Sequence, residues 1–280
     1  RPGKSHMSTD MSTPVQAQEE PIISFRGVDK AFGEKVIYKN LDLDIYRGEV
    51  LTVIGGSGMG KSVMLKMLIG LLQSDGGSIQ AFGEEVTTME GQKLLGMRRR
   101  VAMLFQGAAL FDSMSVAENI KYPLVEHGWG TPAEQDDRVA EVLEMVGMPG
   151  IEALRPSELS GGMKKRVGLA RSIAVKPEVI LYDEPTTGLD PLNVRRINGL
   201  ILRLKEQLGV TSVVVTHDMD SCFTVTDRLA FLYDLKMGFV GTIEQAKEAD
   251  FPALQEFLQG GRGVLGDDEI AGLAQDGVNQ

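Results

Sequence analysis

The strongest constraint on the fold is a glycine-rich loop set between a strand-like run and a helix-like run. The loop comprises Gly55, Gly56, Ser57, Gly58, Met59, Gly60, Lys61 and Ser62, after the apolar run 49–54 and before the amphipathic segment 63–72. This is the strand-loop-helix context of the pattern G-x-x-x-x-G-K-[ST]. Backbone N–H groups freed by the glycines, and the positive end of the helix, favour a phosphate. We predict a P-loop, with Lys61 reaching the β- and γ-phosphates and Ser62 ligating Mg²⁺.

The rest of the chain predicts an α/β fold with two kinds of strand. Alternating apolar and acidic residues in 41–45, and a run at 78–82 bounded by turn residues, indicate an antiparallel layer that starts near residue 22. Short, largely apolar runs indicate buried parallel strands at 101–105, 179–182 and 212–216. Helices are expected at 163–175 and 192–208, and a closing hairpin at 229–233 and 237–240.

Three segments are expected along the chain. Residues 1–20 combine apparent expression-vector sequence, 1–7, with a polar start. Residues 21–242 form the nucleotide-binding domain, with a helical subdomain at about 107–165. A helix begins there at Thr131, Pro132 and Glu134, which form a capping box with proline at the first position. Residues 243–280 hold two short helices, 243–249 and 252–258, and a tail with weak amphipathic character around Ile270 and Leu273.

Composition narrows the classes of partner. The chain has a formal net charge of -10, and the basic run Arg98 to Arg100 is too short to offset it and is expected to be a solvated helix end. This balance disfavours a partner that is recognised through nucleic-acid phosphates. The single cysteine, Cys222, excludes an internal disulfide and suits a reducing cytosol. No apolar run is long enough to span a membrane, so any membrane role is expected to act through a partner.

Two adjacent acids end the predicted strand 179–182. In a P-loop protein this is the Walker B pattern, in which Asp183 holds Mg²⁺ through water and Glu184 orients or deprotonates the attacking water. A strand that ends in acids is common for solubility alone, and the preceding P-loop is what favours the catalytic interpretation.

A second glycine-rich turn, Leu159-Ser160-Gly161-Gly162-Met163, lies shortly before the Walker B acids. With the P-loop, it makes the sequence resemble the ATP-binding-cassette family, whose signature motif is usually LSGGQ. The resemblance implies a P-loop NTPase with a RecA-like parallel core, an antiparallel β layer and a helical subdomain. It also implies that Ser160, Gly161 and Gly162 bind the γ-phosphate of ATP held by a second copy of the chain, in a head-to-tail nucleotide-sandwich dimer.

The same resemblance assigns roles to further residues, one motif at a time. Gln106 matches the glutamine that contacts Mg²⁺ and water and senses the membrane partner. Asp190, in Gly188-Leu189-Asp190, matches the loop that crosses the dimer interface. His217 matches the switch histidine that contacts the γ-phosphate and positions Glu184, and Phe32 matches the aromatic ring that stacks on adenine. His127 has no such context and is expected at the surface.

Two positions depart from the family pattern. Val63 stands where threonine is common after the P-loop serine, which leaves the Mg²⁺ ligand Ser62 unchanged. Met163 replaces the usual glutamine of the signature motif and so removes a side-chain amide near the ribose of the second protomer's nucleotide.

Segments 109–120, 160–171 and 255–260 look like the Mla and Mce-type lipid-transport ATPases of bacteria. That resemblance implies a peripheral subunit on the cytoplasmic face of the inner membrane, an MlaE-type permease, and a periplasmic MCE lipid-binding protein. The cargo would be phospholipid or a related lipid. We expect Phe111, Met114 and Val116 to contribute apolar surface to the groove that receives the permease.

Other functions stay open at this point. The chain could serve an importer or exporter of an amino acid or another solute, since such ATPase subunits do not touch their cargo. A cassette that acts on nucleic acid or ribosomes is disfavoured by the acidic charge, and by the short stretch 107–159 between Gln106 and Ser160. A protein that binds nucleotide without hydrolysing it is disfavoured by the presence of Glu184 and His217.

Overall fold

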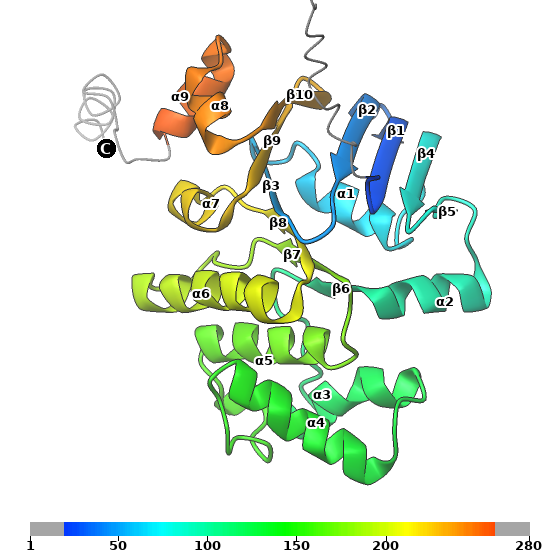
Figure 1. Ribbon diagram of the computed structural model, residues 1–280, viewed down its shortest axis with the longest axis vertical. Helices are drawn as coiled ribbons and strands as arrows, with labels where there is room; N and C mark the ends of the chain where they lie inside the picture. The colour runs from blue at the N-terminus through cyan, green and yellow to red at the C-terminus, as the bar shows by residue number, and fades with distance from the viewer. Residues whose placement is uncertain (1–19, 261–280) are drawn as a thin grey trace, which may run out of the picture.

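The computed structural model describes residues 20–260, which form two β-sheets surrounded by helices (Figure 1). The larger sheet has six strands in the order β10-β9-β3-β8-β7-β6, and every neighbouring pair except β10 and β9 is parallel. Its strands are β3 (Val50–Gly55), β6 (Val101–Leu104), β7 (Val179–Asp183), β8 (Thr211–Val215), β9 (Arg228–Tyr233) and β10 (Lys236–Gly241). Largely apolar runs predicted buried strands here, and β3, β7 and β8 are buried along their whole length.

The smaller sheet is antiparallel, as the alternating pattern predicted. Its strand order is β2-β1-β4-β5. The strands are β1 (Ile23–Phe32), β2 (Lys35–Ile45), β4 (Gly76–Ala81) and the two-residue β5 (Glu84–Glu85). Within β2, Leu41, Leu43 and Ile45 are buried, because one face of this sheet packs on the interior.

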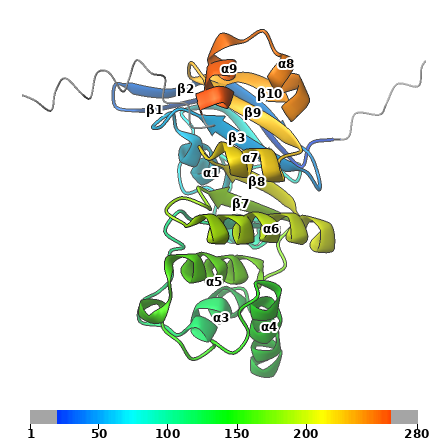
Figure 2. The same cartoon turned by 90° about the vertical axis from the view of Figure 1, so that its left-hand side faces the viewer.

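The helices cover the larger sheet and extend away from it. They are α1 (Lys61–Leu68), α2 (Gly91–Arg100), α3 (Val116–Glu126), α4 (Pro132–Met145), the short 3₁₀ helix η1 (Pro156–Glu158), α5 (Gly161–Ile173), α6 (Pro191–Leu208), α7 (Met219–Val225), α8 (Ile243–Glu248) and α9 (Pro252–Gly260). Below the sheet in Figures 1 and 2, α6, α5 and the pair α3 and α4 lie in successive layers. The capping box predicted at Thr131 and Glu134 is present at the start of α4.

One apolar core joins this group of helices to the sheet. Val142 and Leu143 of α4, Ile120 of α3, and Tyr182 of β7 belong to the same buried cluster. The buried residues of α4 form one apolar stripe on this core, and the helix ends before Gly147, whose φ of 69° suits a left-handed helix stop. A separate cluster packs α8 and α9 on β9 and α7.

The structure corrects one expectation about a single residue and adds detail to two others. Val116 does not offer surface to a groove, because it begins α3 and is fully buried in the core. The run Arg98 to Arg100 is the end of α2, as expected, but Arg98 also donates hydrogen bonds to the carbonyls of Ile69 and Gly70 just after α1. His127 is half-buried, and burial, together with the nearby charge of Arg99, lowers its pKa.

The sequence patterns do not predict α7 or β5, and of α2 they predict only the end, at the basic run 98–100. The other predicted elements are present within a few residues of their expected bounds. The expectations for 1–7, Ile270 and Leu273 fall outside the described residues. The division into 1–20, 21–242 and 243–280 stays a prediction. No helix within residues 20–260 combines the length and apolar character needed to cross a membrane.

The topology places four chemistry-bearing segments at one edge. β3, β8, β7 and β6 are consecutive parallel neighbours, so their carboxyl ends meet along the same side of the sheet. The P-loop follows β3, His217 follows β8, Glu184 follows β7, and Gln106 follows β6. Ligands of open α/β sheets bind outside the carboxyl ends of the strands, so a ligand site is expected at this edge.

Candidate active site

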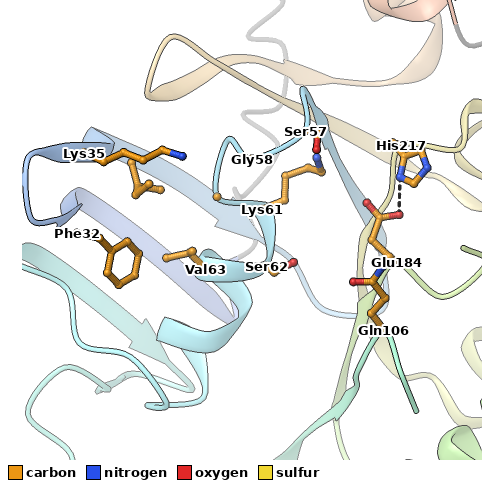
Figure 3. A pocket seen from close by; sticks show the side chains of 12 residues that line it. Phe32, Lys35, Ser57, Gly58, Lys61, Ser62, Val63, Gln106, Glu184 and His217 are labelled. Atoms are coloured by element: carbon orange, nitrogen blue, oxygen red, sulfur yellow. Dashed lines mark ion pairs between the residues drawn. The ribbon is translucent and has the colours of Figure 1, made fainter. Parts of the chain in front are cut away.

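A cavity of about 650 Å³ opens at this edge and brings together most of the predicted site residues (Figure 3). The predicted site residues that line it are Phe32, Ser57, Gly58, Gly60, Lys61, Ser62, Val63, Gln106, Glu184 and His217. Lys35 and Ile37 also line it and were not predicted. Gly55, Gly56 and Met59 belong to the loop but do not line the cavity.

The side chain of Lys61 folds back on the P-loop and hydrogen-bonds to its main chain. This side chain is only 7% exposed, and its Nζ donates to the carbonyls of Gly55 and Gly56 at 2.8 and 3.1 Å. Burial lowers the pKa of Lys61, while the carboxylates of Glu184 and Asp183 act in the opposite direction. A buried ammonium at the start of α1 is well placed to meet a phosphate, because the helix N-terminus supplies further donors beside it.

A side chain at position 60 would clash with its neighbours, so the P-loop requires glycine there. The φ of Gly60 is 101°, and a Cβ built on it would lie 2.3 Å from Ile37 Cγ2. The Tyr38 hydroxyl, which is buried, donates to the Gly60 carbonyl and fixes the loop from the other side.

We therefore expect Gly60→Ala to weaken ATP binding by about tenfold to a hundredfold, since the strain is of order 1–3 kcal/mol in the loop that holds the phosphates. Equilibrium titration with nucleotide measures the change. Gly48→Ala is the matched control: Gly48 also has a positive φ, 75°, but its Cβ would meet nothing within 4 Å and it lies outside the cavity. The control is expected to keep its ATP affinity, and unchanged affinity in Gly60→Ala would contradict the packing argument.

Ser62 and Asp183 form an oxygen pair that fits Mg²⁺. Ser62 Oγ donates to Asp183 Oδ1 at 2.5 Å, although the two residues come from different segments, the start of α1 and the end of β7. Asp183 is 5% exposed. Mg²⁺ is commonly held by one or two protein oxygens together with substrate phosphates and water. Consistent with that mode, the described residues contain no group of three or more His, Cys, Asp or Glu that could hold a metal by themselves.

Glu184 and His217 contact each other across the cavity wall. His217 Nδ1 lies 2.9 Å from Glu184 Oε2, and Figure 3 shows this pair opposite the P-loop. The Thr187 hydroxyl donates to the same carboxylate at 3.0 Å, and Lys165 of α5 donates to the Glu184 carbonyl at 3.1 Å. Glu184 itself has a φ of 50°, a conformation that non-glycine residues rarely adopt and that proteins keep mostly at functional positions.

A chain of polar side chains supports the loops that carry these two residues. Asp218, next to His217, accepts from Ser221 at 2.6 Å and from Thr186 at 3.3 Å. The buried Asn198 of α6 donates to Ser221 at 2.9 Å. The loop after β8 is thereby tied to the loop after β7, and sequence patterns did not predict this connection because its members are ordinary polar residues spread over three elements.

The β1 and β2 hairpin forms the opposite wall. Phe32 is 47% exposed, with Lys30 Nζ 5.1 Å from the centroid of its ring, and an exposed ring can stack on a base. Lys35 is its cross-strand partner, and Figure 3 shows both on the hairpin side of the cavity. The turn at Gly33 and Glu34 could have placed Lys35 opposite Phe32 from the sequence, had it been treated as a two-residue hairpin loop.

The structure does not bring the signature residues or Asp190 into this cavity. Ser160 caps α5 by accepting from the Met163 backbone N–H at 3.3 Å, and Asp190 caps α6 by accepting from the Leu192 and Asn193 N–H groups. Gly162 packs against Asn193, whose Cγ would be 2.6 Å from a Cβ at that glycine. Ser160 and Gly161 stay exposed. The starts of α5 and α6 thus form one joined surface outside the cavity.

The comparisons with known proteins agree with this geometry. The family model described as ABC transporter matches residues 38–187, more than half of the chain. The chain therefore belongs to the ABC transporter family, and it is an ATP-hydrolysing subunit of that class with the α/β P-loop fold predicted. It is also similar to the solved dimeric ATP-binding cassette MJ0796 in a post-hydrolysis state with ADP and Pi, with 30% identity, a TM-score of 0.73, and coverage of 79% of this chain and 98% of that one.

Its relatives carry two different descriptions. The probable ribonucleotide transport ATP-binding protein mkl of Mycobacterium leprae is 40% identical over 240 residues, which is 86% of this chain and 69% of the relative. The intermembrane phospholipid transport system ATP-binding protein MlaF of Haemophilus influenzae is 39% identical, with 81% of this chain and 86% of the relative covered. MlaF of Escherichia coli K12 is 37% identical, with 85% and 89% covered.

Proposed function

We propose that this chain hydrolyses ATP to drive the movement of phospholipid or a related lipid through a membrane permease. The contact between Ser62 and Asp183, beside the pair Glu184 and His217, carries the ATPase part of the proposal. The lipid part is supported by how much of each relative's length the chain matches. It spans 86% and 89% of two phospholipid-transport relatives but 69% of the ribonucleotide-transport relative.

In this proposal the cavity residues divide the work on ATP. Phe32 stacks on adenine, while Lys61 and the N–H groups of the loop bind the phosphates. Ser62, Asp183 and Gln106 would hold Mg²⁺, which offsets phosphate charge when bound. Glu184 accepts a proton from the attacking water and directs that water in line with the bond between the β- and γ-phosphates, which breaks. His217, whose side chain is 62% exposed, holds the carboxylate and faces the γ-phosphate.

A second copy of the chain would complete each site. At the start of α5, Ser160 and Gly161 are exposed, and Gly161 and Gly162 carry main-chain N–H donors. All three lie outside the cavity of their own protomer. Such a helix start binds phosphate well, and a partner chain is the natural source of one. Asp190 at the start of α6 would lie at the same interface. ATP would close the dimer, and hydrolysis would let it reopen.

The permease would dock beside Gln106, on the cytoplasmic face of the bacterial inner membrane. A cavity of about 520 Å³ lies next to Phe105 and is lined in part by Phe111, Tyr122 and Arg171. The rings of Phe111 and Tyr122 are 4.8 Å apart, and both side chains are at least 40% exposed, so apolar surface is available there. The prediction for Phe111 fits this docking position, whereas Met114 does not line the cavity. An MCE-type lipid-binding protein would receive or deliver the lipid on the far side.

Ribonucleotide transport is the second candidate, on the strength of the printed name of the Mycobacterium relative. Both candidates share the ATPase chemistry and differ only in the cargo of the permease.

Co-purification from native membranes separates the two. We expect the chain to bring down an integral membrane protein, and the detergent-solubilised complex to contain phospholipid in fixed proportion after extensive washing. The matched sample uses a chain with Phe111→Asp and Tyr122→Asp, which should lose the membrane protein while keeping ATP binding. Bound ribonucleotide beyond the ATP sites would favour the second candidate, and an amino-acid permease in the complex would overturn the lipid proposal.

A further inference from the structure

A hollow of about 540 Å³ lies apart from the nucleotide cavity, between the end of α4, the side of α5 and the outer side of α6. Four arginines line it: Arg166, Arg195, Arg196 and Arg203. None of its lining residues also lines the nucleotide cavity. The three helices that carry these residues lie in successive layers below the larger sheet in Figures 1 and 2.

The positive charge in this hollow is not neutralised. Among residues 20–260, none of the four arginines takes part in an ion pair. The chain as a whole has a net charge of -10, so a cluster of four cations without carboxylate partners runs against its overall balance. Like charges held together repel one another, and a bound anion would relieve that repulsion.

Arg166 is the most enclosed of the four. Its guanidinium donates to the carbonyls of Val146 and Gly147 at the end of α4, at 3.5 and 3.2 Å. Its Nε is buried and has no acceptor. Burial, and then the neighbouring charge of Arg196, lower the pKa of Arg166, which is the direction expected where cations crowd together without a counter-ion.

Gly199 forms an open floor between the other three arginines. Arg196 and Arg203 flank it at helical spacing on α6, with Arg195 one turn before it, so all three share one face. A Cβ at Gly199 would meet nothing within 4 Å, so packing does not require glycine here, and a glycine inside a helix is otherwise unfavourable. The missing side chain leaves room for a ligand that approaches the helix backbone.

We propose that this hollow binds a small anion that carries several phosphate charges. Arginine matches phosphate oxygens with paired N–H donors, and the volume lies in the range of small-molecule sites rather than of a flat protein contact. The described residues that line the hollow include no aromatic side chain, so the proposed recognition is by charge and not by stacking on a base. The phosphates could belong to a free polyphosphate or to the headgroup of an anionic lipid.

The test uses the full chain with Lys61→Ala in every sample, so that the P-loop contributes little binding. Inorganic triphosphate is titrated by calorimetry, and sedimentation is measured with vesicles of phosphatidylglycerol or of phosphatidylcholine. The variant Arg196→Glu with Arg203→Glu reverses two charges of the hollow. Its matched control, Arg99→Glu with Lys236→Glu, makes the same change of net charge at exposed positions outside it. Gly199→Leu fills the floor without altering charge.

We expect the Arg196→Glu, Arg203→Glu variant to weaken triphosphate binding by about tenfold or more, because charge-assisted hydrogen bonds are lost, and Gly199→Leu to weaken it as much, because the new side chain occupies the space of the ligand. The control is expected to stay close to the parent. If the headgroup is the source, the same pattern appears with phosphatidylglycerol vesicles and not with phosphatidylcholine. Equal binding by all variants, or equal loss in the control, overturns the site. Polyglutamate that binds more tightly than triphosphate, with the same dependence on the arginines, would overturn the phosphate chemistry.

Discussion

Replacing Glu184 by glutamine is expected to lower kcat for ATP hydrolysis by about 10²- to 10⁴-fold, because the amide cannot accept the proton of the attacking water. Glutamine has nearly the same shape and keeps an oxygen that can accept from Thr187, so the unusual backbone at this position gains no new clash. ATP binding should stay within a few-fold of normal, since Lys61 and the loop N–H groups are unchanged.

Phosphate release and equilibrium nucleotide binding, measured on the same preparation, test this separation of binding from turnover. Glu206→Gln is a suitable control, because Glu206 is exposed on α6 and lies outside the cavity. Near-normal turnover in Glu184→Gln would remove Glu184 from the proposed mechanism.

Two inactive variants are expected to regain activity when they are mixed. Lys61→Ala damages the P-loop half of a composite site, and Ser160→Asp damages the signature half by placing a carboxylate against the γ-phosphate. Aspartate caps a helix as well as serine does, so α5 should keep its stability. In a mixed dimer one site carries both defects and the other carries neither, and random pairing in a two-fold dimer should restore roughly a quarter of normal turnover.

Phosphate release by the equimolar mixture, set against each variant alone, measures the recovery. Lys61→Ala mixed with Glu184→Gln is the control, because both changes fall on the same half and every mixed site stays defective. Absence of recovery in the first mixture, or equal recovery in both, would argue against a site shared between two chains.

The sequence predicted which residues lie together at the cavity wherever a short motif fixes both a fold and a chemistry. The P-loop, the acids after β7 and His217 after β8 each follow a buried apolar run, and parallel pairing then places their ends on one edge. Once those strands had been identified, the approach of Ser62 to Asp183 required no further information.

Other features depended on contacts that leave no local trace. α2 buries only Met97, so it has no apolar stripe to reveal it, and α7 is short and begins at a capping residue, Asp218. Val116 was misplaced because its neighbours Phe111 and Met114 do stay partly outside the core, and apolar type alone does not tell the faces apart. The arginine hollow joins residues from α5 and α6 that are separated by a strand and a loop.

Helix α5 connects two places that the proposed dimer would assign to different ATP molecules. It begins at Ser160, which would touch nucleotide bound by the partner, and about one turn later Lys165 donates to the main chain of Glu184 in its own protomer. A displacement of the helix start therefore bears directly on the residue that activates water at the other site. Cooperativity between the two ATP sites would then be transmitted within each chain along a single rigid helix, in addition to any contact across the interface.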